Sequence, residues 1–399
     1  MTAPPRPAGA APADGTLVLG IETSCDETAA SVVEWRDGAP RVRSNAVSSQ
    51  HEVHERYAGV VPELASRAHL ERIVPVVREA TARAGCGLRD LHAVAVGNRP
   101  GLIGSLLVGN AAAKAYAWGL GLPVIGVDHV AAHLAAGLMD APTVRWPALG
   151  LVVSGGHTHL FAMEGPTEMR LLGRTIDDAI GEAFDKAATV LGLGYPGGPA
   201  LDRRSDAGRP DAVRFPMPRL TARSGRRGSD GARERPQGHG SPMAAGADAA
   251  PAEGRTLDFS FSGMKTALLY AVRGVPAVQG RPAPAPPEAL TEQRVSDLCA
   301  SFQRAAVAQV ISVLERALDG TAADARTLLV GGGVSANRHL RGELLRLAAA
   351  RGIELRLPAI EHCLDNAAMI AALAHWRLAA GQVDDLLLAP QPQSALGHG

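Results

Sequence analysis

The sequence predicts an α/β fold made of two duplicated lobes. Short apolar runs that are typical of buried strands alternate with longer stretches of helical periodicity along most of the chain. Two of these runs, residues 16–21 and 148–153, each end in a turn that leads into further strand-like sequence. A strand–turn–strand unit that recurs in this way indicates an ancient duplication.

The first lobe is predicted to cover residues 16–146, after an Ala- and Pro-rich tail at residues 1–15 that we expect to be disordered. Its strands are short and apolar, and each is followed by a turn or a helix. The expected strands are residues 16–21, 29–34, 42–47, 93–96 and 123–127, and the expected helices end near Arg83 and Trp118 or begin at His129.

The second lobe is predicted to cover residues 147–399, with Trp146-Pro147 at the boundary. It repeats the alternation of the first lobe, but residues 221–254 are rich in Arg, Gly, Ala and Pro and lack apolar periodicity. We expect a disordered insertion there, a solubilising loop being the simpler interpretation and contact with RNA phosphates the alternative. The other expected elements are strands at 148–153, 327–330 and 354–357 and helices at 175–192, 291–318 and 367–380.

Composition excludes several classes of protein. Forty basic residues balance 40 acidic ones, so no overall positive field attracts nucleic acid and any such partner would bind a local patch. Aromatic residues make up 4% of the chain, which argues against a stacking platform for single strands. Four scattered cysteines without a CxxC pair exclude a cysteine-cage zinc site and fit a reducing cytoplasm. No apolar run is long enough to span a membrane.

Two histidines one helical turn apart form a candidate metal site. Residues 128–133 read Asp-His-Val-Ala-Ala-His, and Asp128 is a good N-cap for a helix that begins at His129. His129 and His133 would then share one face of the helix, as half of a transition-metal site. The alternative is a pair of ordinary polar helix histidines, and the pair alone does not decide between the two.

Three further turns have the composition of ligand-binding segments. Residues 22–28 form a polar, acidic turn between two strands, a layout found in phosphate or metal–nucleotide hairpins and also in ordinary polar hairpins. Residues 154–157 and 331–337 carry paired or tripled glycines at the ends of strands, where the backbone can approach a ligand closely. Neither segment matches GxGxxG, so a dinucleotide fingerprint is not supported.

Several motifs, taken together and in order, resemble the tRNA N6-adenosine threonylcarbamoyltransferases. The resemblance covers nearly the whole chain from Thr16 to about Ala380. The motifs are residues 19–28 (LGIETSCDET), 60–69 (VVPELASRAH), 128–133 (DHVAAH), 152–159 (VVSGGHTH), 175–199, 258–266 (DFSFSGMKT), 330–337 (VGGGVSAN) and 365–370 (DNAAMI).

The resemblance implies the fold shared by actin, sugar kinases and heat-shock ATPases, with a nucleotide cleft between the two lobes. It implies one divalent metal ion, Fe²⁺ or Zn²⁺, held by His129, His133 and Asp365, a donor set that leaves positions open for a substrate. It also implies contacts with nucleotide and substrate, which in this sequence fall on Val152, Val153, Ser154, Gly155, Gly156, Asp185, Gly198, Asp202 and Asn337.

The implied reaction moves the threonylcarbamoyl group of threonylcarbamoyl-adenylate to the exocyclic amine of the adenosine next to the anticodon, in tRNAs that read codons beginning with A, and releases AMP. Because such an amine is a poor nucleophile, positioning and electrostatics should dominate catalysis. Glu22 and Asp26 are the candidates for a general base, as acidic residues of the turn expected to face the cleft. The implied partners, besides tRNA, are a shorter degenerate paralogue and a small ATPase.

The sequence departs from the family pattern at two places near these motifs. Arg99-Pro100-Gly101 stands where members usually carry Gly-Pro-Gly, so a permissive backbone position is lost and an anion contact is gained. Leu364 replaces a common threonine before Asp365, which removes a hydroxyl.

Three other functions are alternatives to this transfer reaction. An ATPase or small-molecule kinase of the same fold would not need the His–His–Asp set. A zinc endopeptidase with this histidine spacing needs HExxH, but Val130, Ala131 and Ala132 supply no glutamate. A non-catalytic scaffold in a tRNA-modifying complex is the third.

Overall fold

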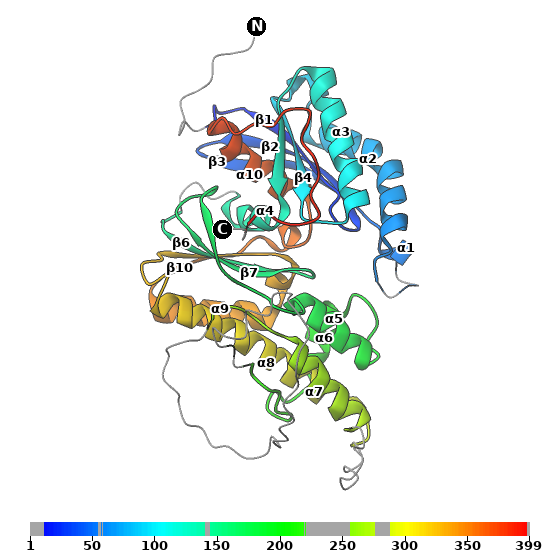
Figure 1. Cartoon of the computed structure of the whole chain (residues 1–399), viewed down its shortest axis with the longest axis vertical. Helices are drawn as coiled ribbons and strands as arrows, with labels where there is room; N and C mark the ends of the chain where they lie inside the picture. The colour runs from blue at the N-terminus through cyan, green and yellow to red at the C-terminus, as the bar shows by residue number, and fades with distance from the viewer. Residues whose placement is uncertain are drawn as a thin grey trace, which may run out of the picture.

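A computed structural model of the chain describes residues 12–54, 57, 59–139, 144–218, 220, 256–275 and 288–396. The predicted insertion at 221–254 and most of the predicted N-terminal tail lie outside these residues. Figure 1 shows two sheets, one above the other along the long axis, with helices around each.

The first sheet has five strands in the order β3-β2-β1-β4-β5. The pairs β1–β2 and β2–β3 are antiparallel, whereas β1–β4 and β4–β5 are parallel. All five strands were predicted, and β2 and β3 are longer than expected. Their bounds are β1 Leu17–Glu22, β2 Glu27–Arg36, β3 Ala39–Ser49, β4 Ala93–Arg99 and β5 Val124–Asp128.

The second sheet has the order β10-β9-β6-β7-β8. Here β6–β7 and β7–β8 are antiparallel, whereas β6–β9 and β9–β10 are parallel. From its other edge this sheet has the strand order and orientations of the first, so the predicted duplication is confirmed. The bounds are β6 Ala148–Val153, β7 Thr158–Met163, β8 Met169–Arg174, β9 Thr327–Gly331 and β10 Glu354–Arg356.

Helices cover both sheets. The α2 and α3 helices pack on one side of the first sheet and α10 on the other, while α5, α8 and α9 contribute to the apolar core of the second sheet. The bounds are α1 His51–His54, α2 Pro62–Ala84, α3 Ile103–Leu120, α4 His129–Ala135, α5 Ile180–Val190, α6 Gly197–Ser205, α7 Ser262–Arg273, α8 Glu292–Asp319, α9 Arg338–Arg351 and α10 Ala367–Ala379.

The last helix returns to the first sheet. After β10, the final strand of the second sheet, the chain crosses back, and α10 packs against β1 to β5. The predicted second-lobe range, residues 147–399, therefore contains a helix whose packing partners lie in the first sheet. Figure 1 shows this crossing, with α10 beside β1 and β3 although it is coloured as the end of the chain.

The short helix α4 lies between the two sheets (Figure 1). Ala131 and Ala135 on one side pack with β5 and α10 residues. Val130 and Leu134 on the other side pack with residues of β6, β7 and β9. Both sheets therefore fix the position of α4, and side chains at its start lie at the junction of the two halves.

Candidate metal centre and the turns around it

Asp128 starts the helix that carries the predicted histidine ligands. Its Oδ1 accepts hydrogen bonds from the backbone N–H groups of Val130 at 3.0 Å and Ala131 at 3.3 Å, which confirms the predicted N-cap. The rings of His129 and His133 follow one turn apart, with their centroids separated by 4.6 Å. Both residues are buried.

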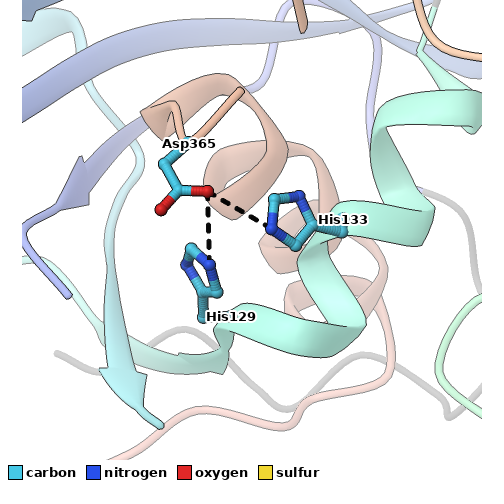
Figure 2. A group of neighbouring side chains, drawn as sticks. All are labelled: His129, His133 and Asp365. Carbon is cyan, nitrogen blue, oxygen red and sulfur yellow. Dashed lines mark ion pairs between the residues drawn. The ribbon is translucent and has the colours of Figure 1, made fainter. Parts of the chain in front are cut away.

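Asp365 completes a group of three ligand-type side chains. Its Oδ1 lies 3.5 Å from His129 Nε2 and 3.3 Å from His133 Nε2, and one ligand atom from each residue falls within 4.8 Å of the others. Figure 2 shows both rings projecting from α4 toward Asp365, which directly precedes the N-cap of α10. The group thus joins two helices that are far apart in the sequence.

The hydrogen bonding of His133 tests whether this group suits a metal ion. Its side chain is fully buried, its Nδ1 has no hydrogen-bond partner, and its Nε2 has only the Asp365 carboxylate at 3.3 Å. A buried polar nitrogen without a partner is costly unless something else binds it. Two imidazoles and one partly exposed carboxylate fit a divalent transition metal with open positions.

Glu22, one of the two candidate bases, is held behind His129. Its Oε2 lies 2.9 Å from His129 Nδ1, and its Oε1 accepts a hydrogen bond from the backbone N–H of Ser24 at 2.5 Å. The side chain is 1% exposed. Both oxygens are therefore engaged, in the arrangement of a carboxylate that orients a metal-binding histidine.

The surroundings of the two histidines shift their pKa values in opposite directions. Burial by itself lowers the pKa of His129, but the carboxylates of Asp365 and Glu22 outweigh burial and hold that pKa well above its usual value. Burial lowers the pKa of His133. For Asp365 burial acts upward, and the two histidines overcome it and hold the pKa well below its usual range.

The second candidate base, Asp26, lies next to Glu27, a residue to which the sequence analysis gave no role. Burial, followed by the charges of Asp365 and Asp26 and a hydrogen bond from Asp26, raises the pKa of Glu27 to about 9. These effects favour the protonated form of Glu27 beside Asp26. The only sequence signal for this pair was the density of carboxylates in the turn.

The glycine turn between β6 and β7 is open to solvent. The backbone N–H of Ser154 donates to the carbonyl of His157 at 2.8 Å, which closes the turn. Gly155 and Gly156 are exposed, and a Cβ built on either one would have no atom within 4 Å. The His157 ring centroid lies 6.3 Å from that of His129, so this free backbone borders the His–His–Asp group.

The glycines after β9 pack against the same elements. A Cβ on Gly331 would lie 2.1 Å from the carbonyl oxygen of His133, and one on Gly332 would lie 2.4 Å from that of Val153. Gly332 also has φ 95°, a conformation that side chains rarely adopt. The three predicted segments at 128–133, 152–157 and 331–337 therefore meet at one place.

The remaining predicted contact residues lie on or next to helices of the second half of the chain: Asp185 on α5, Gly198 and Asp202 on α6, and Asn337 at the start of α9. Asp185 Oδ1 accepts hydrogen bonds from the N–H groups of Gly197 at 2.8 Å and Gly198 at 3.1 Å. Residues 197–199, at the end of the 175–199 motif, form the start of α6. Val152 and Val153 are fully buried, so neither side chain is exposed to a ligand.

Asp202 and Asn337 are brought together, but both are engaged within the protein. Asn337 Oδ1 caps α9 through the N–H of Leu340 at 2.9 Å, and its amide nitrogen lies 3.3 Å from Asp202 Oδ1. Sequence reasoning missed Arg338, whose Nε donates to Asp202 Oδ2 at 2.9 Å. Asp202 and Arg338 line a cavity of about 380 Å³.

The two departures from the family pattern have visible consequences. The anion contact expected of Arg99 is made inside the protein, where its Nε lies 3.6 Å from Asp128 Oδ2. Leu364 is 66% exposed, beside the ligand-type carboxylate of Asp365.

Fold and site together define a two-lobed α/β protein of the actin type with a His–His–Asp group between its sheets. A sequence model of the tRNA N6-adenosine threonylcarbamoyltransferase family matches residues 41–372. The chain belongs to that family, whose members are transferases that modify tRNA. The kinase or ATPase alternative is not favoured.

Named relatives agree with this assignment. The tRNA N6-adenosine threonylcarbamoyltransferase of Trichlorobacter lovleyi is 45% identical over 93% of this chain and 94% of its own. That of Symbiobacterium thermophilum is 45% identical over 96% of this chain and 98% of its own.

A solved structure of HypF from T. kodakarensis matches at a TM-score of 0.54 and 14% identity, over 94% of this chain and 49% of that one, and shows the shared fold alone. No helix in the part of the chain that the structure describes is both long enough and apolar enough to cross a membrane.

Proposed function

We propose that this chain transfers the threonylcarbamoyl group from threonylcarbamoyl-adenylate to the exocyclic amine of the adenosine adjacent to the anticodon, in tRNAs that read codons beginning with A, and that AMP is released. The observation that carries this proposal is the open glycine turn at Gly155 and Gly156 beside the His–His–Asp group. Free backbone N–H groups next to a cation site suit an acyl phosphate donor.

His129, His133 and Asp365 would hold one Fe²⁺ or Zn²⁺ ion. Such an ion, when bound, supplies a Lewis acid that offsets negative charge on the donor. Glu22 orients His129 through the 2.9 Å contact with Nδ1, which leaves Nε2 directed toward Asp365. Glu22 then acts on the geometry of the ligands and does not take a proton from the substrate.

The chain itself positions the two substrates. The turn at Ser154, Gly155 and Gly156, with the backbone of Val152 and Val153 behind it, would bind the phosphate of the adenylate. Asp185, Gly198, Asp202 and Asn337 would border the rest of the nucleotide, near the cavity lined by Asp202 and Arg338.

Asp26 remains the candidate to accept the proton of the amine. It is half-buried in the acidic turn, beside Glu27, whose pKa is raised by burial and by neighbouring charges. Because the attacking amine is weak, most of the rate enhancement should come from holding it against the carbamoyl carbon.

The proposed setting is the bacterial cytoplasm. A shorter degenerate paralogue and a small ATPase are the expected protein partners, and copurification from cells with the tagged chain tests for them. The chain carries no net charge, so tRNA would bind a local basic patch.

Nucleoside mass spectrometry of tRNA from cells depleted of this protein tests the function. Wild type should restore threonylcarbamoyladenosine, whereas His133→Ala should not. His92→Ala, at the other end of β1 where the ring accepts a hydrogen bond from Leu17, is the matched control and should restore it. Persistence of the modification after depletion would contradict the proposal.

Two further measurements separate a catalyst from a scaffold and test the proposed base. Purified His133→Ala should lose bound metal but still assemble with its partner proteins, and a scaffold would keep the modification in that variant. Asp26→Asn should lower kcat while Zn²⁺ affinity stays unchanged. A wild-type kcat in Asp26→Asn would remove Asp26 from the mechanism.

A further inference from the structure

A C-terminal segment of irregular structure lies along the open edge of the first sheet. We call residues 381–396 the C-terminal strap. The strand β5 is the edge of that sheet, and the strap covers it through Asp384, whose N–H donates to the carbonyl of Val124 at 2.9 Å. Asp384 Oδ2 in turn accepts from the N–H of Gly126 at 2.8 Å. Pairing of this kind protects an exposed strand edge.

Farther along, the strap contacts the end of β4. The backbone N–H of Gln391 donates to the carbonyl of Asn98 at 2.9 Å, and Gln391 Oε1 accepts from Arg99 Nη1 at 3.2 Å. Leu388 and Leu396 pack against apolar clusters of the first sheet and of α4. These contacts fix the path of the strap toward the start of α4.

The strap then reaches the carboxylate that caps α4. Ser394 Oγ donates to Asp128 Oδ2 at 2.6 Å. The guanidinium of Arg99, which departs from the family pattern, lies 3.6 Å from the same oxygen. Asp128 is 7% exposed, so few water molecules can replace these contacts.

Asp128 therefore divides its two oxygens between two tasks. Oδ1 caps α4 through Val130 and Ala131, and Oδ2 is held by Ser394 and by the charge of Arg99. The next residue is His129, so a rotation of the Asp128 carboxylate would break the cap hydrogen bonds to Val130 and Ala131 and loosen the first turn of α4, where His129 lies. A hydrogen bond to a charged carboxylate is strong enough to restrict such a rotation.

We propose that Ser394 and Arg99 are positioning residues that fix the histidine pair on α4 through the side chain of Asp128. This inference rests on the proposed metal site at His129, His133 and Asp365. It gives the strap a role in ligand geometry besides the covering of the β5 edge, and it assigns a use to the arginine that replaces a family glycine.

Metal binding by the purified full-length chain tests the inference. Zn²⁺ affinity is measured by competition with a chromophoric chelator, and ligand geometry by the visible absorption of the Co²⁺-loaded protein. Ser394→Ala should weaken Zn²⁺ binding about five- to tenfold, below the usual range for a group that contacts a ligand directly, because Ser394 acts through Asp128. Its Co²⁺ bands should shift or broaden.

Three other variants sharpen the test. Ser394→Thr keeps the hydroxyl and should restore wild-type affinity, whereas Arg99→Gln should weaken it by a smaller factor, because a contact at 3.6 Å without a hydrogen bond contributes less. Gln393→Ala changes an exposed neighbour on the strap and should bind as wild type does.

Wild-type affinity and Co²⁺ bands in Ser394→Ala would overturn the inference, as would a lower thermal stability with unchanged bands, because the strap would then be only structural. If wild type binds no Zn²⁺, or His133→Ala binds as wild type does, the proposed metal site itself is wrong and the inference fails with it.

Discussion

The turns that follow β1 and β6 occupy the same place in the two duplicated sheets, yet they have opposite characters. Beside β1, Glu22 is buried and bonded to His129 Nδ1 and to the N–H of Ser24. Beside β6, Gly155 and Gly156 are exposed and have no neighbouring atoms where a side chain would begin. Both turns border the same His–His–Asp group.

This difference shows how a duplication can divide one task. The first turn begins with Glu22, whose carboxylate is directed to the inside of the protein, where it orients His129. The second turn has lost side chains, so its backbone N–H groups are accessible from solvent. One copy therefore prepares the metal ligands, and the other is left free for a ligand from outside. Substitutions in each turn should accordingly change different measured quantities.

The largest effect is expected from Glu22→Gln. The amide can accept a hydrogen bond at only one end, so either the contact with His129 Nδ1 or the one with the N–H of Ser24 is lost. Zn²⁺ affinity should fall about 10- to 100-fold, the usual cost of changing a group that orients a metal-binding histidine. Competition with a chromophoric chelator measures the fall.

Glu71→Gln, at an exposed position of α2, is the matched control for Glu22→Gln. It removes the same charge from the same half of the molecule and should leave Zn²⁺ affinity unchanged. Equal affinity in both variants would mean that the buried carboxylate behind His129 is not part of the metal site.

The next effect tests a property that both halves share. His159 lies on β7 and His375 on α10 against the first sheet, and burial lowers the pKa of each to about 4. The unfolded chain, with histidines near pKa 6.5, binds more protons between pH 6.5 and 4, so stability falls as the pH drops through that window. Each histidine should remove about 2 kcal/mol between pH 7.5 and 5.

Urea unfolding of wild type, His159→Gln and His375→Gln at the two pH values measures this contribution. Each variant should lose about 2 kcal/mol less than wild type on acidification, whatever its stability at pH 7.5. His375 Nε2 donates to the carbonyl of Val33 at 3.0 Å, so His375→Gln should also be less stable at pH 7.5. A wild-type pH dependence in both variants would show that neither ring resists protonation in the folded chain.

Sequence patterns predicted the elements of the site better than their connections. The spacing of His129 and His133 and the capping residue Asp128 follow from helical periodicity, and the structure confirms the helix. Asp365 came only from the family resemblance, because no local pattern links it to α4. The base role considered for Glu22 could not be tested without knowing that its carboxylate is directed at His129.

The C-terminal strap and the return of α10 were not predicted for a related reason. The strap has no periodicity, and its polar contacts are separate hydrogen bonds that Ser394, Gln391 and Asp384 make with residues far along the chain. The sequence pattern predicted the helix α10 correctly, but periodicity does not say which sheet that helix will cover.

The smallest effect is expected in the open turn, and it decides whether that turn binds the donor. Gly156→Ala adds a methyl group that touches nothing in the protein, so the unfolding free energy should stay unchanged. If a phosphate rests on this backbone, the methyl group obstructs it, and kcat/KM for threonylcarbamoyl-adenylate should fall about tenfold, or ~1.4 kcal/mol. Gly165→Ala, at another open glycine, should change neither quantity.

Zn²⁺ affinity should remain at the wild-type value in Gly156→Ala, in contrast to Glu22→Gln. If Gly156→Ala weakened Zn²⁺ binding and left kcat/KM intact, the division of tasks between the two turns would be wrong.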